Sequence, residues 1–430
     1  ASPPSPMNRM ERRRLARPLC ALTLAALAAC PPAGAGGGAA PETGPRPVGP
    51  TAAQMARLPM RFEVVGRGVV THTRTTDVVA FRGQDGKDYA ITGTFGGCIR
   101  CVGDRVYVWD VSDPARPVVT DSVRVDARAI NDVAVNATGT LAAIARRGAE
   151  SRRNGVVLLD LSTPAHPTIL SEYWETLTGG VQAVFIDGTR LYAADVGGGD
   201  LAILDISDPR DPKPHGRWGV PQSPDRYLNE VFVRDGLAYL AYWDDGLVIL
   251  DVGNGIKGGT PRLPRLVSQV RYRTEYRNLR HGNTHYVFPY TNRAGRRYVF
   301  VADEILPDNA DFSRRIDIGG LLHVFDARNL EAPTEVATYE VPDRGINKFW
   351  VENDTLYVGT NNGGLRAVDV GGELRGNLQG REVAVLATGA EQAYVPNLTM
   401  TWAAMPYNGL VFATDFNSGL WVTRLAPAER

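Results

Sequence analysis

The chain has 430 residues with 47 basic and 47 acidic side chains, so its formal net charge at pH 7 is zero. A hydrophobic fraction of 43% allows a large core and excludes wholesale disorder, and the balanced charge argues against a nucleic-acid binder, which needs a basic face. Four cysteines in a chain of this length exclude a small fold held together by disulfides.

Residues 1–29 contain the features of an export signal, preceded by the short upstream segment ASPPSP. A region with several arginines follows Met7, and an apolar stretch then extends from Leu19 to Ala29. This stretch is too short to cross a membrane as a stable helix. A basic region followed by a short apolar region predicts a secretory signal peptide.

The apolar stretch ends in Leu27-Ala28-Ala29-Cys30, which resembles the lipobox of bacterial lipoproteins. The resemblance implies that Cys30 carries lipid chains, becomes the mature N-terminus and anchors the protein to a membrane without spanning it. We therefore expect an exported protein on an outer membrane or cell surface. The alternative is an ordinary signal peptide with an incidental cysteine. Residues 30–59 are rich in Pro, Gly and Ala, which predicts a flexible tether.

Residues 60–427 repeat a four-strand pattern with a period near 45 residues. Six apolar segments end in an aspartate that precedes a turn, at positions 110, 160, 205, 251, 326 and 369, and a seventh related segment is GLWVTRLAP at 419–427. Two β-branched and aromatic-rich segments precede each of them, as expected for strands. This period with strand content predicts an all-β fold, a seven-bladed β-propeller of four-stranded blades.

The seventh repeat lacks an outer strand, because the chain ends soon after residue 427. The segment RFEVVGRG at 61–68 has the pattern of the outer strands of other repeats. We therefore expect this N-terminal strand to pair with the seventh blade and close the ring, which removes an exposed edge.

Polar residues at the start of the first strand of each repeat form an aligned column: Asp77, Asp132, Gln182, Glu230, His285, Lys348 and Met400. A second column, at the end of the following strand, contains Asp195, Asp303 and Asp415. Both columns are expected at the mouth of the central channel. In the fifth repeat His281, His285, Asp303 and Glu304 are predicted to lie close together, and His285, Asp303 and Glu304 are a candidate site for a divalent cation. The alternative is that these groups cap strand ends and hold water.

The connections on one face of the predicted propeller are long and irregular, and loops on a rigid scaffold often carry function. The segment 271–283 contains Tyr276 and Arg277, which are candidates for binding an anionic or sugar ligand; the alternative is a solvated loop. Cys98 and Cys101 lie in another of these loops, and in an exported protein they are expected to form a local disulfide.

The segment Leu247-Val248-Ile249-Leu250-Asp251 and the recurring Ser-Asp-Pro turns resemble the LVIVD-repeat family of bacterial secreted propellers. The resemblance covers the repeat region and implies the fold, but no activity. We expect a membrane-tethered binding module with a protein or a small polar or glycan ligand on its loop-rich face, rather than an enzyme. The alternative is a hydrolase or lyase assisted by Ca²⁺, Mn²⁺ or Zn²⁺ near the fifth blade.

Overall fold

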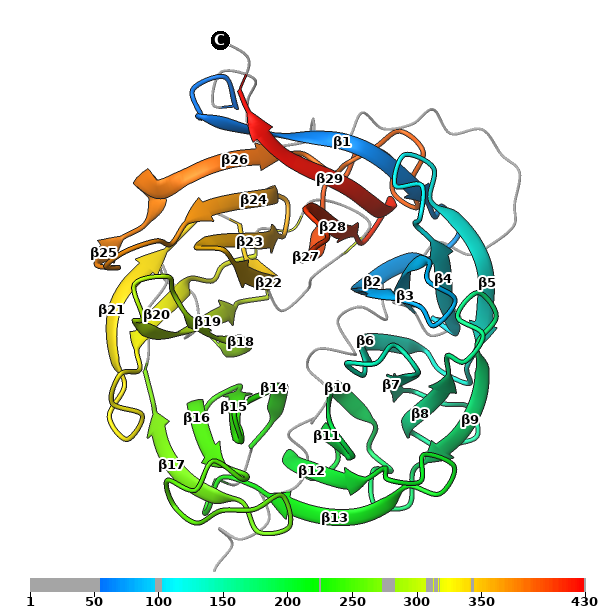
Figure 1. Ribbon diagram of the computed structural model, residues 1–430, viewed down its shortest axis with the longest axis vertical. Coiled ribbons are helices and arrows are strands. Elements are labelled where there is room, and N and C mark those ends of the chain that lie inside the picture. The colour runs from blue at the N-terminus through cyan, green and yellow to red at the C-terminus, as the bar shows by residue number, and fades with distance from the viewer. Residues whose placement is uncertain are drawn as a thin grey trace, which may run out of the picture.

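The computed structural model describes residues 55–96, 103–223, 226–272, 283–306, 312, 316, 318–341 and 344–428. Antiparallel four-stranded blades surround a central axis, which confirms the predicted β-propeller (Figure 1). Within a blade, strands a to d run from the channel to the rim. We call the side with the a–b and c–d turns the turn face, and the side with the b–c and d–a connections the loop face.

The first four blades of the described chain each consist of consecutive strands. Their strands are β2 (Arg74–Arg82), β3 (Asp88–Phe95), β4 (Arg105–Asp110) and β5 (Val118–Arg124) in blade 1, β6 (Ala129–Val135), β7 (Leu141–Arg147), β8 (Gly155–Asp160) and β9 (Thr168–Tyr173) in blade 2, β10 (Val181–Asp187), β11 (Arg190–Asp195), β12 (Asp200–Asp205) and β13 (Lys213–Trp218) in blade 3, and β14 (Leu228–Arg234), β15 (Leu237–Tyr242), β16 (Gly246–Asp251) and β17 (Arg265–Val270) in blade 4.

The remaining described strands make three more blades, so the described residues form seven. Their strands are β18 (Asn283–Thr291), β19 (Arg297–Glu304), β20 (Leu322–Asp326) and β21 (Thr334–Tyr339) in blade 5, β22 (Ile346–Glu352), β23 (Thr355–Thr360), β24 (Gly364–Asp369) and β26 (Glu382–Leu386) in blade 6, and β27 (Thr401–Tyr407), β28 (Leu410–Asp415), β29 (Gly419–Pro427) and β1 (Met60–Val69) in blade 7. The 3-10 helix η2 spans Gln379–Arg381.

Blade 7 contains strands from both ends of the folded region. β1 pairs antiparallel with β29, from Met60 opposite Pro427 to Val69 opposite Gly419, and confirms the predicted closure of the ring. β1 also has the shape of an outer strand. A Cβ atom at Gly66 would overlap the carbonyl oxygen of Pro114 in the c–d turn of blade 1, just as one at Gly216 in β13 would overlap that of Pro261.

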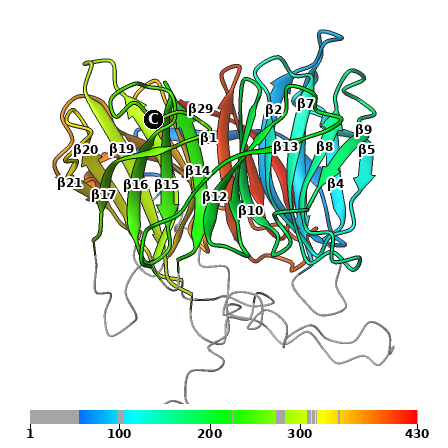
Figure 2. The ribbon, with the colours of Figure 1, turned by 90° about the horizontal axis from the view of Figure 1, so that it is seen from below.

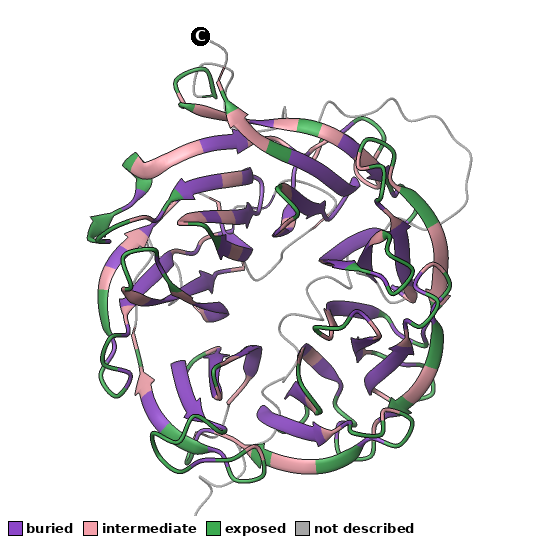
Figure 3. Ribbon diagram, in the orientation of Figure 1, coloured by how far each residue is buried: buried purple, intermediate pink, exposed green. Residues whose placement is uncertain are grey.

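The core lies between neighbouring blades, because the middle strands are covered on both sides. In β16, Leu247 and Ile249 pack in the core shared with blade 5, and Val248 and Leu250 pack in the core shared with blade 3. A strand buried on both faces needs an unbroken apolar run, which accounts for the repeated sequence pattern. Figure 3 shows the inner and middle strands as largely buried and the outer strands as more exposed.

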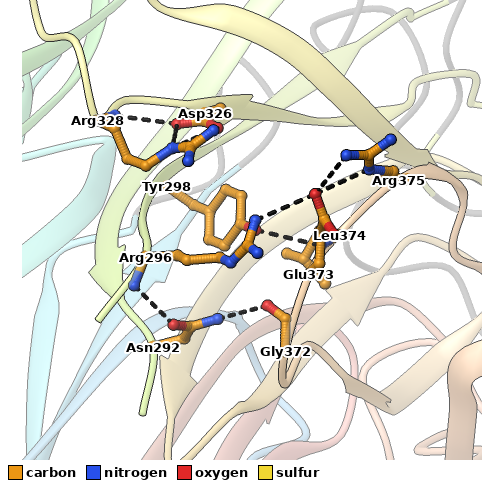
Figure 4. A network of polar contacts seen from close by, with 9 residues as sticks. All are labelled: Asn292, Arg296, Tyr298, Asp326, Arg328, Gly372, Glu373, Leu374 and Arg375. Atoms are coloured by element: carbon orange, nitrogen blue, oxygen red, sulfur yellow. Dashed lines mark hydrogen bonds and ion pairs between the residues drawn. The ribbon is translucent and has the colours of Figure 1, made fainter. Parts of the chain in front are cut away.

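Blades 5 and 6 are also joined on the turn face. The short strand β25 (Gly376–Asn377) of the blade 6 c–d connection pairs parallel with β21 of blade 5. Next to it, the side chain of Asn292 donates a hydrogen bond of 2.6 Å to the carbonyl of Gly372, and the backbone N–H of Leu374 donates one of 3.2 Å to the hydroxyl of Tyr298 (Figure 4). Backbone and side-chain hydrogen bonds therefore link blades 5 and 6 on the turn face.

Candidate functional site

Each of the seven innermost strands in the described chain has an irregular register near its loop-face end. The shifts lie between pairs of residues such as Thr75 and Val78 in β2, Thr284 and Tyr286 in β18, and Ile346 and Phe349 in β22. A β-bulge adds a residue to one strand and changes the direction of the side chains beside it. The bulges therefore determine which polar side chains reach the channel.

Four charged residues from four blades meet at this level of the channel. Lys348 Nζ in blade 6 lies 3.3 Å from Asp77 Oδ2 in blade 1 and 3.3 Å from Glu230 Oε2 in blade 4, and it also contacts Asp132 in blade 2. All four side chains are buried. We call this group the channel tetrad. Its members were aligned in the sequence column, so this part of the column converges as the alignment suggested.

Two carboxylates of the tetrad also bond to the backbone of the next blade. Asp77 Oδ2 accepts a hydrogen bond of 3.3 Å from the N–H of Val133, and Asp132 Oδ2 accepts one of 2.6 Å from the N–H of Val184. Both N–H groups follow a bulge. The tetrad therefore has a structural role, because it pairs backbone donors that the bulges leave unpaired within their own blade.

The other members of the predicted column do not join the tetrad. In blade 5 the residue beside the tetrad is one position further along the strand than predicted. Tyr286, and not His285, is the residue beside the tetrad, with its ring 5.6 Å from Lys348 Nζ. Blades 4 and 5 have the same one-residue bulge, so Tyr286, and not His285, is the register equivalent of Glu230, and the predicted column was wrong by one residue here. In the neighbouring layer, Gln182 accepts a hydrogen bond of 2.9 Å from Asn131, while Met400 packs in an apolar cluster.

Burial changes the proton affinities of the tetrad. Burial raises the pKa of Asp77 well above its ordinary value and that of Glu230 to about 8, although Lys348 opposes both shifts. For Lys348, burial alone would lower the pKa, but Asp132, Asp77 and Glu230 outweigh it and raise the pKa well above its ordinary value. The ammonium group of Lys348 therefore stays charged, while the carboxyl groups of Asp77 and Glu230 retain protons more readily than in water.

In blade 5 the structure separates the proposed metal ligands. His285 Nε2 lies 3.8 Å from Glu304 Oε2, and both side chains are buried. Asp303 instead lies 3.1 Å from His323 Nε2 and 2.9 Å from the hydroxyl of Tyr272. Consecutive residues of a strand point to opposite faces, so Asp303 and Glu304 do not converge. Among the described residues, no group of three or more His, Cys, Asp or Glu is arranged to hold a metal ion.

The histidine pKa values of the two buried pairs in blade 5 are shifted in opposite directions. Burial lowers the pKa of His285 to about 3, with a further contribution from Lys348, and burial raises the pKa of Glu304 to about 7. Burial alone would also lower the pKa of His323, but hydrogen bonds to Asp303 and Glu335 raise it to about 9. His285 is therefore a neutral imidazole at pH 7, whereas His323 is an imidazolium.

Asp195 and Asp415, in the second column, cap the b–c turns of their blades. Asp195 accepts hydrogen bonds from the N–H groups of Gly197 and Gly198 and pairs with Arg217 at 2.8 Å. Asp415 is fully buried and accepts four hydrogen bonds, from the N–H groups of Met400, Asn417 and Ser418 and from the hydroxyl of Thr388. These contacts favour the capping interpretation for both residues.

Several predicted site residues lie outside the described part of the chain. They are Cys30, Cys98, Cys101, Tyr276, Arg277 and His281. The lipid anchor, the disulfide and the binding role of segment 271–283 therefore stay predictions.

A group of side chains on the loop face joins His285 and Gln182 of the predicted column to Tyr227, Trp243 and Arg147, which were not predicted from the sequence. The rings of Tyr227 and Trp243 in blade 4 meet edge to face at 6.1 Å, and Trp243 lies 6.5 Å from His285 of blade 5. The Tyr227 hydroxyl donates a hydrogen bond of 3.2 Å to Gln182 of blade 3 and accepts one of 3.3 Å from Arg147 of blade 2. We call these five residues the loop-face cluster, and it links four consecutive blades.

The sequence contained a signal for His323 but a much weaker one for the loop-face cluster. His323 occupies the position in strand c that Val248 occupies in blade 4, so it is a polar residue where the repeat has an aliphatic one. Tyr227 and Trp243 lie in connections of irregular length, which cannot be aligned between repeats. No regular spacing marks them.

Substituting Glu230 by Gln tests the electrostatics of the tetrad. In the folded protein Glu230 keeps its proton up to about pH 8, whereas an ordinary glutamate loses it near 4.5. Between these values the folded state binds more protons, so the free energy of unfolding falls as pH rises, by at most about 1.4 kcal/mol per pH unit for one proton. The Glu230→Gln variant lacks this contribution. Relative to the wild type, it is expected to gain stability as pH rises from about 5.5 to about 8.5.

Urea unfolding at several pH values measures this difference. The exposed Glu331 provides a control, because Glu331→Gln makes the same chemical change away from the tetrad. Identical pH dependence in the wild type and in Glu230→Gln would contradict the raised pKa.

Substituting Asp303 by Asn tests the buried ion pair of blade 5. The imidazolium of His323 would lose its counter-ion, and breaking a buried pair costs about 3–5 kcal/mol of unfolding free energy. The double variant Asp303→Asn/His323→Val, which introduces the valine found in blade 4, is expected to recover much of this loss. Urea unfolding near pH 7 measures both. A double variant as unstable as the single one would show that His323 is not an imidazolium.

The same variants have a predictable pH dependence. Because the pKa of His323 is raised to about 9, its contribution to stability is complete below about pH 6.5 and is lost as pH rises through 9. The cost of Asp303→Asn should therefore decrease at alkaline pH.

Comparison with known proteins agrees with the fold. A family model described as LVIVD repeat matches residues 178–218 and 225–255, which lie in blades 3 and 4. The β-propeller domain of Myceliophteria thermophila Cps50 (Swd1) aligns with a TM-score of 0.54 at 13% identity, over 86% of this chain and 100% of that one. BamB from Moraxella catarrhalis aligns with a TM-score of 0.52 at 10% identity, over 86% and 99%. At these identities the likeness shows the fold alone.

No curated protein matches this sequence significantly. In the described part of the chain, no helix is long and apolar enough to cross a membrane. The repeat period of the sequence, the four-stranded blades and the family match all indicate the same repeat unit. The chain is a β-propeller that contains LVIVD repeats.

Proposed function

We propose that the protein is an exported, lipid-anchored binding module that holds a protein partner on its loop face. The loop-face cluster is the observation that carries this proposal. It places Tyr227, Trp243 and Arg147 together at the mouth of the channel, half-buried and already fixed by contacts between blades. Tyr, Trp and Arg dominate the binding energy of protein interfaces, since they combine a large apolar area with hydrogen-bonding groups.

Unpaired polar atoms at the loop-face ends of the innermost strands support the same face. The Nδ1 atom of His285, Oδ1 of Asn131, Oδ1 of Asn347 and Nε1 of Trp402 have no hydrogen-bond partner among the described protein atoms. All four residues lie at the loop-face ends of innermost strands. An unpaired buried polar atom costs about 1–3 kcal/mol, so the loop-face ends of these strands hold hydrogen-bonding capacity that the described protein atoms do not use.

Trp243 is the residue with which to test the loop face. A photo-crosslinking amino acid at position 243 of the full chain in its native cell envelope is expected to give protein adducts of discrete mass. Val118 in β5 is the matched control, because it is 57% exposed but lies on the outer rim. Crosslinks to glycan alone would show that the loop face binds a glycan and not a protein. Equal adducts at both positions, or none at 243, would contradict the proposal.

Cys30 is the residue with which to test the anchor. The sequence resembles a lipobox at this position, and lipid chains on Cys30 would hold the protein to a membrane surface. The Cys30→Ala variant is expected to move from the membrane fraction to the supernatant. Cys98→Ala is a control that changes a cysteine without removing the anchor. Retention of Cys30→Ala in membranes after a high-salt wash would contradict lipidation.

A further inference from the structure

The innermost strands enclose a cavity that the loop face does not use. Its volume is about 390 Å³, and its lining residues come from the innermost strands of all seven blades. Small-molecule sites usually have volumes of about 300–1,000 Å³. The channel tetrad lies at one end. In β22 the exposure of the channel-facing positions rises from buried Lys348 through half-buried Trp350 to exposed Glu352, so the cavity opens on the turn face.

The middle of the cavity is apolar and has two unlike sides. Phe185, Phe232, Phe288 and Trp350, from blades 3 to 6, form a continuous aromatic arc with ring centroids 4.8 Å, 4.8 Å and 4.9 Å apart, and all of them except Phe288 line the cavity. The facing blades contribute smaller or flexible residues, including Val79, Ala134 and Met405. The space beside the arc therefore fits a ring or a branched alkyl group.

The charges along these strands favour a positive ligand. Three carboxyl groups of the tetrad share a single ammonium group, that of Lys348. At the open end, Asp187 and Glu352 are exposed and Arg234 is half-buried. Arg82 at the end of β2 is also exposed, so acidic and basic residues balance at the open end, and acidic residues exceed basic ones only at the tetrad end of the cavity.

The aromatic arc already holds one cation. The guanidinium of Arg234 lies 5.1 Å from the ring centroid of Phe232 and 5.2 Å from that of Phe288, and it donates a hydrogen bond to the carbonyl of Pro289. The negative faces of aromatic rings attract cations most strongly where water is excluded. Trp350, the ring that binds cations best, lines the cavity and is not covered by Arg234.

We propose that this cavity binds a hydrophobic organic cation, with its ammonium group toward the carboxyl groups of the tetrad and its ring or branched chain against the aromatic arc. Where these carboxyl groups are ionised, a neutral ligand would forgo their attraction, and an anion would be repelled by them. The site opens on the turn face. It is therefore distinct from the loop-face cluster and goes beyond the proposed function.

Three probes of similar size and different charge test the proposal. Isothermal titration of the full folded propeller at about pH 8.5, where Glu230 with its pKa of about 8 is mostly ionised, compares phenethylammonium, phenethyl alcohol and 3-phenylpropionate as a cation, a neutral molecule and an anion. We expect phenethylammonium to bind at least about tenfold more tightly than either of the others. Failure of phenethylammonium to bind, or equal or tighter binding of the alcohol or the carboxylate, would overturn the proposal.

Variants then locate the binding site. Trp350→Leu is expected to weaken phenethylammonium binding about tenfold through loss of the cation–π contact. At about pH 8.5, where the carboxyl group of Glu230 is mostly ionised, Glu230→Gln should weaken it through loss of charge, and Met405→Trp should abolish it by filling the cavity. Asp211→Asn is the matched control, because Asp211 is an exposed acid in the outer turn between β12 and β13. Near-ultraviolet circular dichroism verifies that each variant is folded.

These variants distinguish the channel from nonspecific binding at the surface. Met405→Trp leaves every charge in place and changes only the space available. If phenethylammonium binds this variant and Trp350→Leu as tightly as the wild type, it binds outside the channel, and the proposal is wrong.

Discussion

The backbone pairing of β1 with β29 is the contact on which the ring depends. Blades 1 to 6 are built from segments that follow one another along the chain, whereas blade 7 forms only when the two ends of the folded region meet. Without β1, the hydrogen-bonding groups on one side of β29 would be exposed, and such an edge promotes aggregation. The entropy cost of joining distant segments rises only slowly with chain length, so a single well-matched strand pair can close a large ring.

Closure also determines what lies in the centre. Lys348 in blade 6 reaches acidic residues of blades 1, 2 and 4 because the ring brings the seven innermost strands around one axis. Burying such charges is costly, and hydrogen bonds from Val133 and Val184 to the carboxylates offset part of this cost. The tetrad is thus a result of ring closure. Through Asp77 and Asp132, the tetrad also accepts hydrogen bonds from backbone N–H groups that follow the bulges of blades 2 and 3.

The sequence predicted the fold well because each blade repeats a local pattern. A strand such as β16 is buried on both sides, so its apolar run and terminal aspartate are visible without tertiary information. The side-chain register was harder to predict. Blades 4 and 5 share the same one-residue bulge, so Tyr286 is the equivalent of Glu230, whereas the predicted column placed His285 there. The separation of Asp303 from Glu304 follows from strand alternation alone and was predictable.

The remaining site residues depend on contacts that no repeat pattern encodes. Tyr227 and Trp243 belong to connections that differ between blades, and their contact with His285 exists only because neighbouring blades pack side by side. The same holds for the aromatic arc, in which each ring comes from a different blade and the rings differ in kind. Such groups become recognisable only after the ring is assembled.

The register of β1 and β29 also fixes how the propeller is presented. Met60 lies opposite Pro427, and both residues lie at the turn-face end of blade 7, where Figure 2 shows the C-terminal end on the upper side. The proposed tether would therefore join the propeller at the rim of its turn face, off the central axis. Because the loop face lies on the opposite side of the propeller, a large partner could bind that face without meeting the point of attachment.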